Sequence, residues 1–230
     1  MRSDYVLLVL GQRRSGKTTL VFGGDPLGRG LVDFAGTRAG ARTFIYDERG
    51  TAPGRSDWLR YETASHLQRW LQAEARGEAP TPGAYYIRPK TAQTKTDFWT
   101  MMSPGIVDGT VKSGVPGTYV VDEAHRVARA KKATGDAFKE AVDSGGNDGM
   151  SFVLATRRFT RLDRDVRTQA SAILSFRQPQ EDIDLMRRSF DRKASAVENL
   201  EGHEFTLFGD ATQELPFYDH ITSLDTYRAP

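Results

Sequence analysis

The segment YVLLVLGQRRSGKT, residues 5–18, is the strongest indication of the fold of this chain. Its continuous apolar run up to Leu10 predicts a strand buried on both faces, and a short helical pattern begins at Lys17. Between them, residues 11–18 follow the spacing G-x-x-x-x-G-K-[ST]. Glycines in such a loop let backbone N–H groups surround a phosphate, and the helix start adds a potential that favours an anion. The segment therefore predicts a nucleotide site.

Each part of this loop has an expected role. Lys17 would reach the β- and γ-phosphates of ATP, and the Thr18 hydroxyl would ligate Mg²⁺. The residues expected to contact the nucleotide are Gly11, Gln12, Arg13, Arg14, Ser15, Gly16, Lys17, Thr18 and Thr19.

Residues 118–123, TYVVDE, supply the second half of such a site. An apolar strand here ends in two acids, at the carboxyl edge where α/β sheets bind ligands. We expect Asp122 to hold the Mg²⁺ shell, partly through water, and Glu123 to polarise the water that attacks the γ-phosphate. A small-molecule kinase needs no such water-activating acid. Asp-Glu-Ala-His also spells a helicase box, but such helicases carry two RecA-like domains and we expect only one here. We expect His125 to be a helix-start residue.

The rest of the chain alternates apolar, β-branched runs with helical patterns, which is typical of a parallel α/β sheet. We expect an α/β, RecA-like P-loop NTPase fold with a mainly parallel central sheet flanked by helices. Residues 1–208 would form that domain, and residues 209–230 a tail that packs on the core or on a neighbouring subunit. Strands are expected at 5–10, 42–46, 84–87, 118–121, 151–155, 172–176 and 204–208. Helices are expected at 17–22, 57–76, 97–102, 124–142, 162–169 and 181–199.

Composition excludes several classes of protein. The 230 residues contain no cysteine, which rules out disulfides and thiolate zinc sites. No stretch approaches the roughly 20 apolar residues of a membrane helix. With 32 Lys and Arg against 30 Asp and Glu, bulk charge does not indicate nucleic-acid binding, which would need basic residues gathered on one face.

A third segment, residues 156–177, narrows the family. After the 151–155 strand, the chain resembles the HerA/FtsK superfamily of DNA-pumping ATPases, in which a sensor strand follows the catalytic Glu. The matching residues are Leu162, Asp163, Val166, Gln169, Phe176 and Arg177. Arg157 stands where many members have a sensor Gln, and Phe159 where they have Pro. This Thr-Arg-Arg version looks more like the genome-packaging ATPases of tailless viruses with an internal membrane.

The resemblance implies an ATPase that pumps double-stranded DNA into a viral capsid, with ATP and Mg²⁺ as cofactors. It implies a homo-oligomeric ring of six subunits, with contacts to DNA phosphates that are independent of sequence. A capsid or virion-membrane vertex protein would be a partner, and the host cytoplasm or the virion the location. Because the phosphate loop begins at residue 11, we do not expect the N-terminal barrel of cellular HerA proteins. Because no stretch is apolar enough to span a membrane, we do not expect the membrane anchor of FtsK pumps.

An arginine from the next subunit would neutralise charge on the γ-phosphate, an effect worth about 10³–10⁵ in rate. The candidates are Arg157, Arg158, Arg177 and Arg126. Asp47, at the end of the 42–46 strand, is a further acid expected near the nucleotide. Candidate pore segments that grip DNA are 88–95 (RPKTAQTK) and 126–132 (RVARAKK). The alternatives are a cellular HerA/FtsK-like translocase in repair or transfer, a P-loop switch protein, and a small-molecule kinase.

Overall fold

The computed structural model describes residues 4–23, 28–35, 42–102, 117–129, 132–145 and 149–230. Over these residues one sheet of eight strands runs in the order β3-β4-β2-β5-β6-β1-β7-β8. Every pairing is parallel except that of β7 with β8. The strands are β1 (Val6–Leu10), β2 (Arg42–Tyr46), β3 (Trp58–Tyr61), β4 (Ala84–Ile87), β5 (Gly117–Val121), β6 (Met150–Thr156), β7 (Ala172–Phe176) and β8 (Phe205–Phe208).

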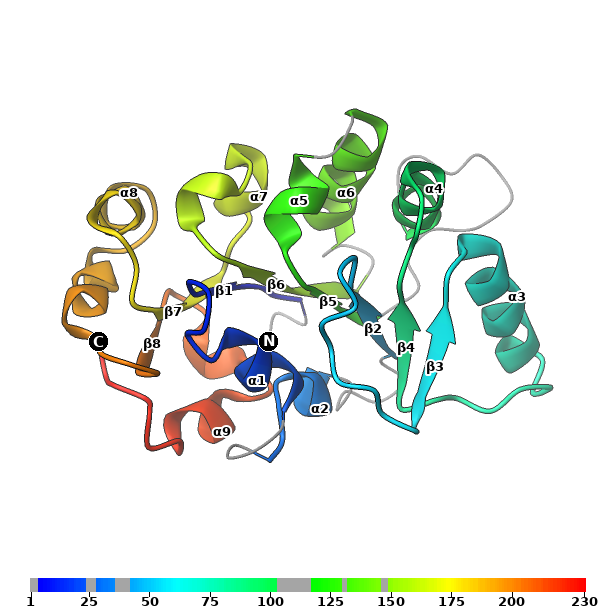
Figure 1. Cartoon of the computed structure of the whole chain (residues 1–230), viewed down its shortest axis with the longest axis horizontal. Coiled ribbons are helices and arrows are strands. Elements are labelled where there is room, and N and C mark those ends of the chain that lie inside the picture. Colours follow the sequence, from blue (N-terminus) through cyan, green and yellow to red (C-terminus); the bar gives the residue numbers. More distant parts are fainter. Residues whose placement is uncertain (1–3, 24–27, 36–41, 103–116, 130–131, 146–148) are drawn as a thin grey trace.

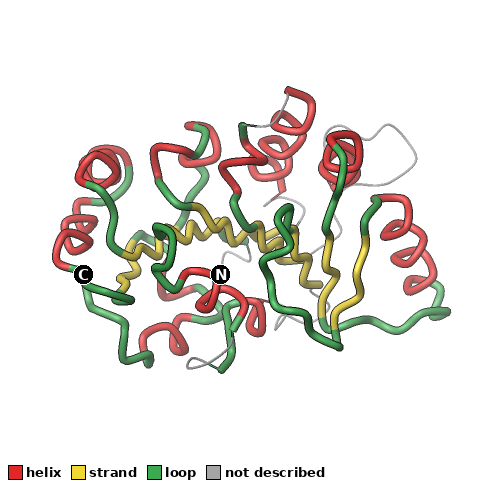
Figure 2. Tube along the Cα trace, in the orientation of Figure 1, coloured by secondary structure: helices red, strands yellow, loops and turns green. Residues whose placement is uncertain are grey.

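Helices cover both faces of the sheet, as Figures 1 and 2 show. Helices α3 to α8 lie on one face, and α1, α2 and α9 on the other. The helices are α1 (Lys17–Phe22), α2 (Val32–Ala35), α3 (Ala64–Ala75), α4 (Ala92–Met102), α5 (Ala124–Ala128), α6 (Lys132–Ser144), α7 (Arg164–Thr168), α8 (Gln180–Ser189) and α9 (Tyr218–Thr222), with 3₁₀ turns at Phe159–Arg161, Arg192–Asn199 and Thr212–Glu214. The central strands β5 and β6 are buried at every residue, as expected for strands covered on both sides. The predicted fold class is confirmed.

The predicted helix over 57–76 is wrong in its first part. Trp58–Tyr61 is an edge strand whose Trp58 pairs with Ala84 and whose Tyr61 pairs with Ile87. The helix starts only after Thr63, whose hydroxyl accepts a hydrogen bond from the His66 N–H. The short apolar run fits both the helical and the strand periodicity, and pairing with β4 makes it a strand.

Two other predicted helices are broken in the structure. The one over 124–142 is two helices, α5 and α6, and the break lets α6 pack against both α4 and α5. The one over 181–199 ends at Ser189. The Asp191 carboxylate then accepts a hydrogen bond from the Lys193 N–H and starts a 3₁₀ turn that packs back on α8. Caps and tertiary packing thus override long helical patterns.

The segment after residue 208 packs on the core. Leu215, Phe217 and Ile221 are buried in the apolar cluster on the α1 side of the sheet. The Phe217 ring meets Tyr5 edge-on at 5.7 Å, and Tyr227 forms a bridge with Phe205. The irregular tail expected from the sequence contains helix α9. Among the described residues, every helix falls short of the length and apolar character that a membrane span requires.

Candidate functional site: a phosphate cavity at the carboxyl edge of the sheet

The predicted phosphate loop follows β1, between the ends of β6 and β7. Its backbone turns through two left-handed positions, Arg14 at φ 67° and Gly16 at φ 94°. Gly16 adopts this conformation without the Cβ clash that other residues meet. Lys17 follows as the first residue of α1 and is only 7% exposed. The loop is therefore shaped as an anion cradle, with a buried cation at its base.

A cavity of about 350 Å³ opens over this loop. Its lining combines the phosphate loop with the ends of three other strands. The lining residues are Gln12, Arg13, Arg14, Ser15, Gly16, Lys17, Thr18, Thr19, Arg49, Thr51, Asp122, Glu123 and Arg157. All the residues predicted to bind nucleotide, except Gly11, thus line one cavity.

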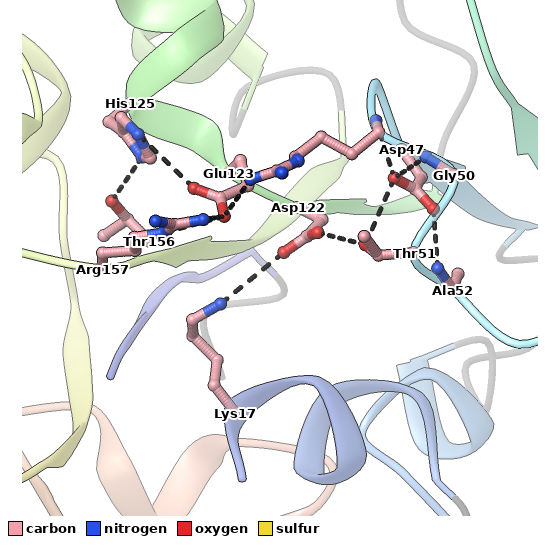
Figure 3. A network of polar contacts seen from close by, with 11 residues as sticks. Lys17, Asp47, Gly50, Thr51, Ala52, Asp122, Glu123, His125, Thr156 and Arg157 are labelled. Carbon is pink, nitrogen blue, oxygen red and sulfur yellow. Dashed lines mark hydrogen bonds and ion pairs between the residues drawn. The ribbon is translucent and has the colours of Figure 1, made fainter. Parts of the chain in front are cut away.

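The acid pair meets the cradle there. Asp122 and Glu123 directly follow β5, and they are 4% and 6% exposed. The Lys17 Nζ lies 3.7 Å from the Asp122 Oδ1 (Figure 3). Because β5 and β1 are parallel neighbours of β6, their carboxyl ends reach the same edge. Residues more than a hundred positions apart in sequence are thereby brought into contact.

Glu123 is surrounded by hydrogen-bond donors and positive charge. Its Oε1 accepts hydrogen bonds from the Arg157 Nε at 2.9 Å and Nη2 at 2.8 Å, and the Arg49 Nη1 lies 3.6 Å away. Burial alone would raise the pKa of Glu123, but the hydrogen bonds from Arg157 and the charges of Lys17 and Arg157 outweigh it and hold that pKa below its usual range. Glu123 is therefore ionised at neutral pH, as a proton acceptor must be.

His125 closes the other side of Glu123. Its Nε2 lies 3.4 Å from the Glu123 Oε2, and its Nδ1 lies 3.0 Å from the Thr156 hydroxyl (Figure 3). Burial lowers the pKa of His125 below its ordinary value, against the opposing charge of Glu123. A neutral ring with its proton on Nε2 satisfies both neighbours. His125 thus orients the acid, a contact that the sequence reading missed by treating it as a helix start.

The arginines proposed from the sequence lie in different places. Arg157 follows β6 and lines the cavity. Arg158 points elsewhere, with its Nε 2.7 Å from the Asp182 Oδ2 and its Nη2 2.6 Å from the Glu181 Oε2. Arg177 is exposed after β7 and outside the cavity lining. A role in a neighbouring subunit's site stays a prediction for these three and for Arg126.

Two cavity residues, Arg49 and Thr51, were not predicted. They lie in the segment that follows β2, and β2 pairs with β5, so this segment reaches the same edge as the acid pair. Asp47, the acid predicted near the nucleotide, is fully buried and is bound by its own loop (Figure 3). The polar DERGT run directly after a predicted strand indicates the carboxyl edge of the sheet, but it does not indicate a place beside the acid pair.

The two predicted pore segments both approach this loop. Glu48 Oε1 lies 2.6 Å from the Lys95 Nζ and 3.2 Å from the Arg126 Nη2. Lys95 belongs to the 88–95 segment, and Arg126 to the 126–132 segment, of which residues 130 and 131 lie outside the described residues. Contact of either segment with DNA stays a prediction.

The donor groups fit a magnesium ion. Asp122 presents a buried carboxylate beside the cradle, and Thr18, which carries a hydroxyl, lines the same cavity. Magnesium is commonly held by one or two carboxylates together with substrate phosphates and water. Asp122 and Thr18 would therefore hold the ion, which would supply charge neutralisation on the phosphates.

No protein-family model matches this sequence, and no curated protein sequence matches it. Solved structures do. B204, the DNA-packaging ATPase of Sulfolobus turreted icosahedral virus, superposes with a TM-score of 0.63 at 17% identity, over 93% of this chain and 96% of B204. The B204 genome-packaging NTPase of Sulfolobus turreted icosahedral virus 2, in complex with AMPPCP, gives 0.62 at 16% identity, over 91% and 94%. The structure of the same protein in complex with ATP-gammaS superposes with a TM-score of 0.61 at 15% identity, over 91% of this chain and 93% of that chain.

These likenesses extend over almost the whole of both chains. The predicted resemblance to viral packaging ATPases is thereby confirmed at the level of the fold. This chain has the P-loop NTPase fold of the B204 genome-packaging proteins.

Proposed function

We propose that this chain is an ATP-hydrolysing motor that pumps double-stranded DNA into a viral capsid. One observation carries the proposal: the phosphate cradle, Lys17, the acid pair and Arg157 converge on one cavity, in a chain with the fold of the B204 packaging NTPases. B204 structures with ATP analogues support nucleotide binding in the same fold.

The residues divide the hydrolysis of ATP between them. Lys17 and the loop N–H groups hold the β- and γ-phosphates. Glu123 accepts a proton from a water molecule whose oxygen attacks the γ-phosphorus. The bond from that phosphorus to the bridging oxygen breaks, and ADP leaves with the electron pair. Arg157 both lines the cavity and hydrogen-bonds Glu123, so one guanidinium can order the base and neutralise charge on the phosphate.

The mechanical step needs partners outside this chain. We propose a homo-oligomeric ring, with six copies as the family pattern suggests, in which Arg158 or Arg177 completes a neighbour's site. For contact with the DNA backbone we propose Lys95 and Arg126, because both pair with Glu48 in the segment after β2 that also lines the cavity. Such phosphate contacts are independent of sequence and sensitive to salt. A capsid or vertex protein would dock the ring, in the host cytoplasm or on the virion.

ATP turnover measured with DNA tests this proposal. We expect duplex DNA to raise the steady-state rate of phosphate release, and this stimulation to weaken steeply between about 50 and 200 mM salt because counterions compete for the phosphate contacts. Single-stranded DNA of the same length is the matched ligand, and the Lys17→Ala variant shows how much turnover comes from contaminants. If DNA did not change the rate of phosphate release at either salt concentration, the result would indicate a nucleotide switch or kinase instead.

A further inference from the structure

The segment that follows β2 is held by a single buried carboxylate. The Asp47 Oδ1 accepts hydrogen bonds from the N–H groups of Arg49 at 3.0 Å and Gly50 at 2.7 Å. Its Oδ2 accepts one from the Ala52 N–H at 2.7 Å and one from the Tyr86 hydroxyl at 2.9 Å. Asp47 is 0% exposed. Because both oxygens are engaged, Asp47 acts as the anchor of this loop.

The turn itself tolerates little change. Gly50 has φ +70°, in the left-handed region, and a Cβ added there would lie 2.4 Å from the Arg88 Cζ. Any other residue would meet backbone strain at this φ, and the flexible Arg88 side chain would have to move aside. Together with the Asp47 anchor, this turn fixes the direction in which Thr51 projects, which is toward the end of β5 (Figure 3).

Thr51 is thereby placed on the predicted magnesium ligand. Its hydroxyl donates to the Asp122 Oδ2 at 2.7 Å, across 71 residues of sequence. A second acceptor, the Asp47 Oδ1, lies at 3.5 Å, so the shorter bond to Asp122 is the stronger one. The other oxygen of Asp122, Oδ1, is the one 3.7 Å from the Lys17 Nζ. The two oxygens of Asp122 therefore have different partners: Oδ2 accepts a hydrogen bond from Thr51, and Oδ1 faces Lys17 in the phosphate cradle.

We propose that Thr51 is a positioning residue of the nucleotide site, which holds Asp122 in the orientation that presents Oδ1 to a nucleotide-bound divalent cation. This inference rests on the proposed function and names a component that neither the sequence motifs nor the comparisons assign. Its physical basis is that the hydrogen bond fixes the side-chain torsions of a carboxylate that would otherwise have to be ordered when the cation binds. Outer-shell partners of this kind change metal affinity by about 10–100-fold.

Equilibrium binding tests this role without turnover. The probe is a fluorescent ATP analogue, titrated with Mg²⁺ and, separately, in EDTA. Thr51→Val keeps the side-chain shape and removes the hydroxyl, and we expect it to raise the Mg²⁺ concentration for half-maximal tightening by about 10-fold. Thr51→Ser keeps the hydroxyl and should remain close to the wild type. In EDTA all three proteins should bind the analogue equally, because the cradle is unchanged.

Thr168→Val, in helix α7, is the matched control for loss of a threonine hydroxyl, and a thermal melt of each variant establishes that it is folded. An unshifted Mg²⁺ titration in Thr51→Val would overturn the inference. So would a Thr51→Ser protein as weak as Thr51→Val, or an equal weakening of both in EDTA. Failure of the proposed nucleotide site is a separate result: Lys17→Ala would then bind the analogue as tightly as the wild type.

Discussion

Glu123→Gln should lower the rate of ATP hydrolysis by about 10²–10⁴-fold while ATP still binds. The substitution keeps the size of the side chain and one carbonyl oxygen but removes the carboxylate that accepts the proton from water. It also replaces an anion that Arg157 contacts at 2.8 Å with a neutral amide. Single-turnover release of phosphate, compared with equilibrium binding of ATP in the same preparation, separates the two effects.

The dependence of the wild-type hydrolysis rate on pH is a second test of Glu123 as the base. Because the pKa of Glu123 lies below its ordinary value of 4.5, the base stays ionised above that pH and should cause no loss of rate there.

Glu78→Gln is the matched control for Glu123→Gln, since Glu78 forms an exposed ion pair with Arg76. Wild-type turnover in Glu123→Gln would mean that another group activates the water.

Lys17→Ala should weaken ATP binding by about 100-fold. Lys17 is expected to reach two phosphates, and two charge-assisted hydrogen bonds at about 1.5 kcal/mol each give a loss of this size. The substitution also leaves the buried Asp122 without the cation 3.7 Å away, which adds repulsion toward the triphosphate. Calorimetric titration with a non-hydrolysable ATP analogue measures the change.

Lys139→Ala provides the control, because Lys139 pairs with Asp163 on the surface between α6 and α7. We expect this variant to bind the analogue with wild-type affinity. If Lys17→Ala did so too, the phosphate cradle would not be the nucleotide site, and the proposed hydrolysis would have no structural basis.

The parts of the site that could be predicted are those in which a local motif carries its own geometry. The glycine spacing of residues 11–18 sets the loop, and the acids after an apolar strand sit at the carboxyl edge whatever the strand order. Arg49 and Thr51 could not be found in this way, because their place in the cavity depends on β2 pairing with β5. Strand order is a long-range property that no local pattern expresses.

The same limit explains why residues 58–61 were predicted as helix and why the sequence could not show which arginine lines the cavity. Residues 58–61 form a strand because β4 is available to pair with them, which their own pattern does not show. Arg157 and Arg158 are adjacent in sequence, yet one reaches Glu123 and the other the buried Asp182. Alternation of side chains in extended backbone sends neighbours in different directions, and only the partners reveal which one faces the cavity.

The central claim is that the phosphate cradle and Asp122 bind one metal–triphosphate complex. Electron–nuclear double resonance of the protein with Mn²⁺ and AMPPCP, after removal of unbound nucleotide, measures the coupling between the ion and phosphorus. We expect one phosphorus-coupled Mn²⁺ per chain in the wild type and its loss in Asp122→Asn. A wild-type Mn²⁺ signal without phosphorus coupling, or an unchanged signal in Asp122→Asn, would contradict it.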